Sequence, residues 1–85
     1  IGKYAFSMCY SLSSIIIPEG VINIGRNAFE LCDKLTSIIF PSTLQNIGKE
    51  IFYGTNIEKI VIPKGQKERF LKMGLKKYEK YIVEN

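Results

Sequence analysis

Few residues of this sequence have side chains suited to chemistry, and their arrangement does not favour catalysis. Histidine is absent, and the eight Asp and Glu residues are scattered among basic neighbours in segments that read as turns. General acid–base catalysis needs a histidine, or carboxylates with perturbed pKa values, held in a cleft. No nucleophile–base pair and no phosphate-binding glycine loop is present either. We therefore expect no enzymatic activity, no catalytic residues and no cofactor.

The residues that could bind a ligand recur at one interval. Lys3, Arg26 and Lys49 are 23 residues apart, and the two cysteines, Cys9 and Cys32, are separated by the same step. Cations stacked at such an interval could attract an acidic partner or an anionic glycan. The alternative is an ordinary solvated edge, and we regard this basic column as the weaker of two candidate binding surfaces.

The 23-residue step extends through the whole motif, which occurs three times. An Ile-Gly pair recurs at positions 1, 24 and 47, and a phenylalanine recurs at 6, 29 and 52. A period of this length is typical of solenoid proteins, in which each repeat leaves an apolar face that its neighbours cover. Ordering one repeat costs roughly 1–2 kcal/mol of backbone entropy per residue, so a single repeat cannot fold alone. We expect the repeats to stack.

Each repeat contains a β-branched run that ends at a proline, which predicts a short strand. The three runs are residues 12–18, 35–41 and 57–63. Side chains alternate along a strand, so if Ile15 and Ile17 face the core, Ser14 and Ile16 face outward. The resulting outer row is our preferred binding surface, since an exposed apolar row can mark a contact site; the alternative is that β-branched residues merely suit strands. The row consists of Ser14, Ile16, Ser37, Ile39, Lys59 and Val61.

Two further segments complete each repeat. Residues 20–25 and 42–48 predict a second extended piece, and its glycines suit corners that need positive φ. Residues 26–32 place Ala28, Phe29 and Cys32 at near-helical spacing, so we expect one helical or irregular turn there.

Cys9 and Cys32 would then lie in adjacent coils, about 5 Å apart at the backbone. A disulfide tolerates that distance, but side chains in register point the same way. A zinc site would need further histidine or cysteine ligands. We favour buried free thiols over a disulfide or a metal site.

The last 22 residues differ from the repeats in charge and period. Residues 1–63 hold five basic and five acidic residues, whereas residues 64–85 hold seven basic and three acidic ones and so carry the net charge of +4. Phe70, Leu71, Leu75, Tyr78 and Ile82 follow helical spacing. Gly74 interrupts this pattern, which leaves one helix or two short helices open. We prefer a helical cap over the last repeat to a nucleic-acid-binding or membrane-associated helix, because these apolar residues are needed to cover the solenoid's end.

The motif Ile-Gly-x-x-Ala-Phe, with a cysteine three residues after the Phe and then Leu-x-x-Ile-x-Ile/Phe-Pro, resembles the BspA-like leucine-rich repeat family. The resemblance covers residues 1–63, and residues 64–85 look like the closing segment of such proteins. It implies a right-handed solenoid of parallel strands, displayed by or secreted from host-associated bacteria and some protists, with roles in adhesion. The third repeat departs from the pattern, since it lacks the cysteine and is one residue shorter, so that Pro63 follows Pro41 by 22.

Together these observations predict an α/β repeat protein, mostly β, with three leucine-rich repeats in residues 1–63, the first incomplete, and a helical C-terminal cap in residues 64–85. We expect an extracellular or cell-surface module that binds another protein, such as a host or partner-cell surface protein, without nucleic acid or membrane insertion. The alternatives are a structural spacer or terminal cap of a larger surface protein, or an accessory domain of a secreted enzyme. The chain enters in mid-repeat at Ile1, so we expect it to be the C-terminal piece of a longer protein and to self-associate through its uncovered N-terminal end.

Overall fold

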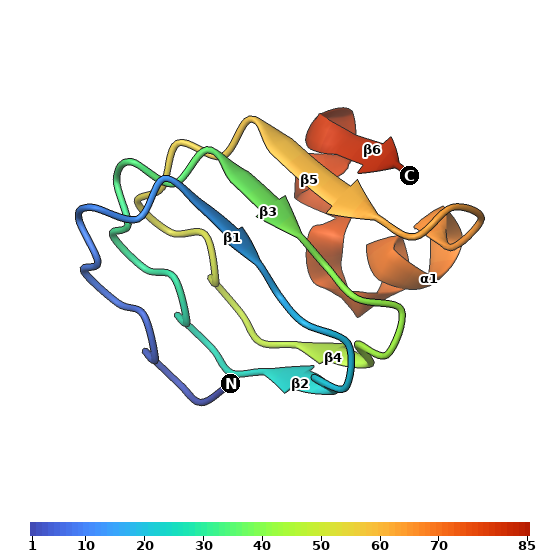
Figure 1. Ribbon diagram of the computed structural model, residues 1–85, viewed down its shortest axis with the longest axis horizontal. Coiled ribbons are helices and arrows are strands. Elements are labelled where there is room, and N and C mark those ends of the chain that lie inside the picture. The colour runs from blue at the N-terminus through green and yellow to red at the C-terminus, as the bar shows by residue number, and fades with distance from the viewer.

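A computed structural model describes residues 1–85, and it shows three coils that lie one beside the next (Figure 1). Each coil contributes one strand to a parallel sheet: β1 (Ser14–Ile16), β3 (Ser37–Ile39) and β5 (Lys59–Ile62). Two shorter parallel strands, β2 (Asn23–Ile24) and β4 (Asn46–Ile47), form the second side. The prediction of a repeat solenoid with parallel strands is confirmed.

The register follows the sequence repeat, including its irregularity. Ser14 pairs with Ser37 at the 23-residue step, and Ser37 pairs with Lys59 at a step of 22. The deletion in the third repeat is therefore absorbed before β5, and the inward and outward sides of the strands are preserved.

The third side of each coil is irregular rather than helical. The sequence analysis left both conformations open for this segment. It contains two positions with left-handed backbone, at equivalent places in every coil. These positions turn the chain so that alternate N–H groups point to the next coil instead of closing a helical turn. They are Tyr4, Asn27 and Glu50 at the first place, and Met8, Leu31 and Gly54 at the second.

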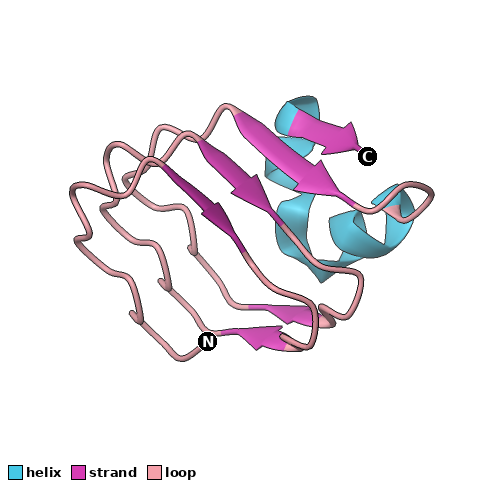
Figure 2. Cartoon of the chain, in the orientation of Figure 1, coloured by secondary structure: helices cyan, strands magenta, loops and turns pink.

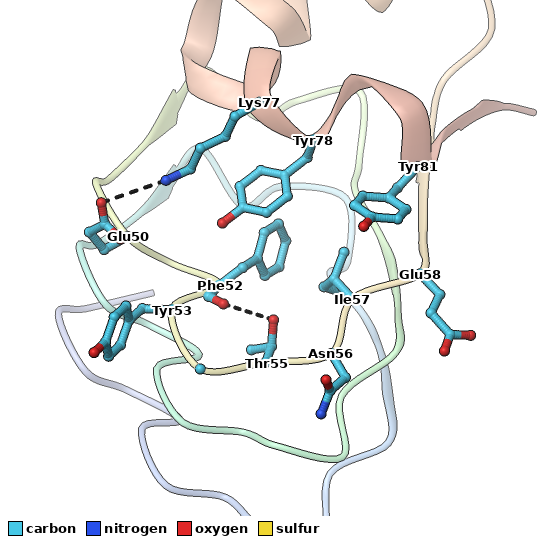
Figure 3. Close-up of a pocket in the computed structure, with 11 residues that line it drawn as sticks. Glu50, Phe52, Tyr53, Thr55, Asn56, Ile57, Glu58, Lys77, Tyr78 and Tyr81 are labelled. Carbon is cyan, nitrogen blue, oxygen red and sulfur yellow. Dashed lines mark hydrogen bonds and ion pairs between the residues drawn. The ribbon is translucent and has the colours of Figure 1, made fainter.

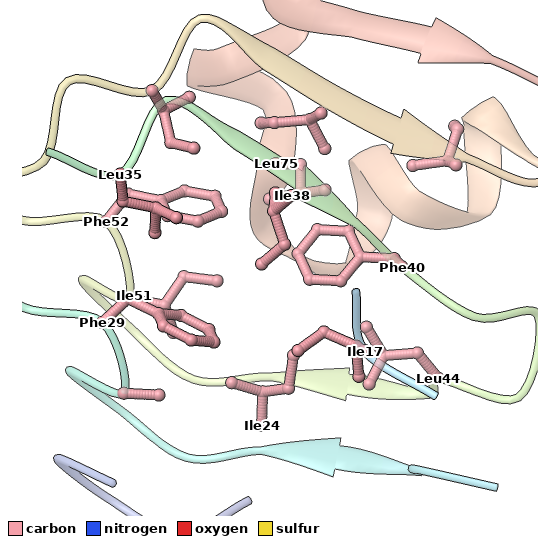
Figure 4. Packing of buried hydrophobic residues seen from close by; sticks show 14 of the residues in the cluster. Ile17, Ile24, Phe29, Leu35, Ile38, Phe40, Leu44, Ile51, Phe52 and Leu75 are labelled. Carbon is pink, nitrogen blue, oxygen red and sulfur yellow. The ribbon is translucent and has the colours of Figure 1, made fainter. Parts of the chain in front are cut away.

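The interior is a column of apolar side chains that passes through all the coils (Figure 4). The rings of Phe6 and Phe29 stack with centroids 5.5 Å apart, and those of Phe29 and Phe52 follow at 6.4 Å. Rings at these distances in offset stacks add about 0.5–1.5 kcal/mol per pair beyond their buried area. The predicted stacking of equivalent phenylalanines is confirmed.

Residues 64–85 pack against the open side of the third coil (Figure 2). They form the helix α1 (Lys67–Phe70), the π-helical turn η1 (Leu71–Leu75) and the 3₁₀ helix η2 (Lys76–Tyr81). Gly74, with φ of 127°, separates the helical pieces, so the interpretation of more than one short helix is correct. Phe70 and Leu75 are fully buried, and the Phe70 ring lies 5.9 Å from that of Phe40.

The chain ends in a strand that the sequence did not predict. Strand β6 (Ile82–Glu84) pairs in parallel with β5 and gives the sheet the order β1-β3-β5-β6. Assigning Ile82 to the helical pattern was therefore wrong, because its backbone pairs with Ile60 in the sheet. A single β-branched residue at helical spacing cannot reveal that a neighbouring strand lies within pairing distance.

The expected role of the corner glycines is only partly correct. Gly20 has φ of 101°, as predicted for a tight corner, but Gly25 and Gly48 do not have positive φ. These two positions need glycine because there is no room for a side chain. A Cβ on Gly25 would lie 2.5 Å from the backbone nitrogen of Lys3 in the preceding coil. Glycine at this corner lets consecutive coils approach closely.

Candidate functional site

The outer row of the sheet points away from the core, but the exposure of its apolar side chains falls from the first coil to the third. Ile16 is 70% exposed and Ser14 is exposed, whereas Ser37 and Ile39 are partly covered. In the third coil Lys59 is exposed, but Val61 is only 8% exposed. The expectation that Val61 lies on an exposed surface is therefore wrong, although its register beside Ile39 is as predicted.

Strand β6 explains the burial of Val61. It places Val83 directly beside Val61, so that Val61 lies between Ile39 on one side and Val83 on the other. Val83, which was not among the predicted site residues, is itself 44% exposed. The apolar row thus continues into the fourth strand, and its largest exposed member is Ile16.

The basic column lies at one corner of successive coils, and all three of its side chains are exposed. Lys3, Arg26 and Lys49 directly follow the Ile-Gly pairs. The Arg26 guanidinium donates to the hydroxyl of Tyr4 at 3.4 Å, and this interaction raises the pKa of Arg26 above its ordinary value. The nearby Glu30 carboxylate also raises the pKa of Arg26, so an acidic side chain lies close to the basic column.

Both cysteines are free thiols, and they differ in their surroundings. Cys32 is fully buried, and its Sγ donates to the backbone oxygen of Phe6 in the preceding coil at 2.9 Å. Burial, the largest cause, raises the pKa of the Cys32 thiol. Cys9 is partly covered. A neutral buried thiol that is already hydrogen-bonded acts as a small core residue.

A groove lies at the seam between the third coil and the C-terminal segment (Figure 3). It has a volume of about 520 Å³, and Lys77, Tyr78 and Tyr81 of η2 form its wall opposite the coil. Lys77 forms an ion pair with Glu50 at 3.6 Å at one end. The coil contributes Glu50, Phe52, Tyr53, Gly54, Thr55, Asn56, Ile57 and Glu58. The sequence analysis included Tyr78 in a helical pattern but did not predict this groove.

A smaller hollow of about 400 Å³ lies beside the groove and shares Glu50, Lys77 and Tyr78 with it. The Glu50–Lys77 ion pair therefore lies along both hollows. Apolar side chains, including Ile47, Met73 and Leu75, line this second hollow.

No group of three or more His, Cys, Asp or Glu side chains is arranged to hold a metal ion. None of the helical segments is both long and apolar enough to cross a membrane.

Comparison with known proteins gives one match. A family model described as "BspA type Leucine rich repeat region (6 copies)" matches residues 1–77. The matched range includes all three coils and most of the C-terminal segment. No curated protein and no solved structure gives a significant match.

Proposed function

This chain belongs to the family of BspA-type leucine-rich repeats, and from that premise we propose that it is an adhesion module of a secreted or surface-displayed bacterial protein. The family is one of repeat-built interaction modules that typically have no enzymatic activity, and its members are generally found in surface or secreted proteins. In this proposal the chain is not an enzyme, and its partner is a protein on a host or partner cell.

The proposed contact surface is the outer face of the sheet, formed by Ser14, Ile16, Ser37, Ile39 and Lys59, without the buried Val61. The observation that carries it is Ile16, a large apolar side chain that is 70% exposed at the C-terminal end of strand β1. Ile39 lies beside Ile16 on the neighbouring strand, about 4.8 Å away, and Val83 continues the apolar row on β6, beyond Val61. A rigid sheet holds such a row in one geometry, which reduces the entropy lost on binding.

Two architectural features accompany the proposal. Residues 64–85 act as a cap, which is supported by the burial of Phe70 and Leu75 against the third coil. The solenoid has the right-handed sense that parallel β connections almost always adopt.

The test compares two isoleucines with similar chemistry on different sides of the solenoid. Ile16→Glu removes the apolar centre of the proposed surface, and Ile22→Glu alters a 47% exposed isoleucine next to β2. Each variant is immobilised and incubated with biotin-labelled surface proteins of host cells. We expect Ile16→Glu to lose the proteins that the unmodified chain retains, while Ile22→Glu keeps them and both variants keep the unmodified melting temperature.

Retention that is equal for the two variants would contradict binding through the strand face. If a longer parent protein carrying Ile16→Glu retains the surface proteins as well as the unmodified parent does, the alternative is favoured, in which these coils act as a spacer or terminal cap. The basic column is the secondary candidate surface, and replacement of Lys3, Arg26 and Lys49 by alanine tests it in the same assay.

A further inference from the structure

On the irregular third side of the solenoid, the backbone hydrogen bonds between coils all run in one direction. Alternate N–H groups of the first coil donate to carbonyl groups of the second, at 3.1, 2.8 and 2.8 Å; the pairs are Tyr4 to Arg26, Phe6 to Ala28, and Met8 to Glu30. The second coil donates to the third at 3.0, 3.1 and 2.7 Å; the pairs are Asn27 to Lys49, Phe29 to Ile51, and Leu31 to Tyr53. Each coil thus offers three donors to the backbone that follows it.

In the third coil the equivalent donors have no acceptor. The N–H groups of Glu50, Phe52 and Gly54 form no hydrogen bond to any backbone or side-chain group, whereas the carbonyl groups beside them are used by the second coil. Residues 64–85 occupy the position of a fourth coil but present side chains, not a row of carbonyls, to this segment. Three strong donors therefore have no hydrogen-bond partner within the chain.

All three residues line the groove at the seam, together with Tyr78 and Tyr81 (Figure 3). A groove of about 520 Å³ falls within the range of about 300–1,000 Å³ that is usual for ligand sites. The tyrosines supply apolar surface with polar tips, which suits a contact that is half exposed to water.

We infer that this groove binds an extended peptide segment of a partner protein, whose carbonyl groups at alternate residues accept from Glu50, Phe52 and Gly54. The same triad of donors occurs twice more in the chain, and both times a peptide backbone occupies it. The occupant would add to the third side of the solenoid as a strand adds to a sheet edge, with main-chain bonds giving affinity and side-chain pockets giving specificity. This surface is separate from the outer face of the sheet.

The test uses nuclear magnetic resonance of the ¹⁵N-labelled chain. The probe is an acetylated and amidated peptide with the sequence of residues 49–56, because this segment satisfies the equivalent donors of the second coil. At about 1 mM peptide we expect the amide protons of Glu50, Phe52 and Gly54 to move downfield and, near saturation, to exchange with solvent roughly tenfold more slowly. The amides of Asn27, Phe29 and Leu31 should not move, since they are already bonded.

Two further arms make the result decisive. Tyr81→Ala should weaken the affinity for the peptide at least fivefold. Tyr10→Ala, which alters an exposed tyrosine of the first coil, should leave this affinity unchanged. Sodium acetate at the same concentration should not reproduce the shifts. Unmoved amides at residues 50, 52 and 54 would overturn the inference, because the probe carries the row of carbonyl groups that the equivalent donors of the second coil bind. Equal shifts with acetate would also overturn it, since the donors would then form a simple anion site. If Tyr81→Ala does not fold, the titrations of the unmodified chain still decide the question.

Discussion

At the scale of single residues, the corner glycines show how stacking selects an amino acid. Gly2, Gly25 and Gly48 are equivalent in sequence, but only the last two have a coil before them. A Cβ on Gly48 would overlap the backbone of Arg26, whereas a Cβ on Gly2 would meet nothing within 4 Å. The need for glycine at this corner therefore comes from the neighbouring coil and not from the turn itself.

We expect Gly25→Ala and Gly48→Ala each to lower the free energy of unfolding by about 1–3 kcal/mol, because the coils must separate to admit the methyl group. Gly2→Ala should change it by less than about 0.5 kcal/mol. Urea unfolding followed by circular dichroism measures all three. Equal losses at the three positions would show that backbone conformation, not space, decides the residue.

The buried Cys32 thiol gives the chain a predictable response to alkaline pH. Because its folded-state pKa is raised by burial, the stability that it contributes is fully present below the unfolded-state pKa and is lost as the pH rises through the folded-state pKa. We expect the melting temperature of the unmodified chain to fall above about pH 9 more steeply than that of Cys32→Ala, which cannot ionise there. Parallel curves for the two proteins between neutral pH and the alkaline range would contradict this account.

At the scale of elements, the attachment of the C-terminal segment depends on one arginine as well as on the apolar contacts. The Arg69 guanidinium donates to the backbone oxygens of Ser42 and Leu44 at a corner of the second side, and to the side chain of Gln66. It also lies over the ring of Phe70, 4.9 Å from the centroid. Arg69 thus joins helix α1 to the turn that leads into β4.

We expect Arg69→Ala to lower the free energy of unfolding by about 1.5–3 kcal/mol, the usual range for hydrogen bonds to charged groups. Arg69→Lys should recover only part of the loss, because an ammonium group cannot reproduce the planar fork. Arg26→Ala is the matched control, since Arg26 is exposed and makes one long hydrogen bond. A loss at position 26 as large as that at position 69 would contradict a specific role for Arg69.

At the scale of the whole molecule, burial is uneven along the solenoid. Equivalent core residues of the second coil are fully buried, whereas those of the first coil are only partly covered. The first-coil residues are Phe6, Cys9, Leu12 and Ile15, and their buried counterparts are Phe29, Cys32, Leu35 and Ile38. The N-terminal side of the first coil thus leaves apolar surface and one edge of the sheet open.

We expect this 85-residue chain to self-associate through that side, because association removes apolar surface from water. The weight-average mass from light scattering should rise as the protein concentration increases from micromolar to millimolar. Leu12→Lys, which places a charge at the partly covered end, should shift the rise to higher concentration. A constant monomer mass at the highest concentration would contradict the prediction.

The solenoid and its register could be predicted from the sequence alone. The 23-residue step forces equivalent side chains to lie above one another, because no repeat can bury its apolar face alone. The residue missing from the third repeat was visible in the spacing of Pro41 and Pro63, and the pairing of Ser37 with Lys59 follows from it. The helical character around Phe70 and the break at Gly74 were also legible, since both depend on local periodicity and backbone freedom.

The surroundings of the last coil became known only from the three-dimensional fold. Residues 64–85 fold back onto the third coil, and no periodic pattern in the sequence predicts how they do so. Three features depend on it: the pairing of β6 with β5, the burial of Val61 beside β6, and the groove at the seam. The unpaired donors of Glu50, Phe52 and Gly54 have the same origin. In the first two coils the equivalent donors bind the coil that follows, and the third coil is followed by residues 64–85 instead. A repeat specifies the contacts between like coils, whereas contacts with a unique segment are set by long-range packing in three dimensions.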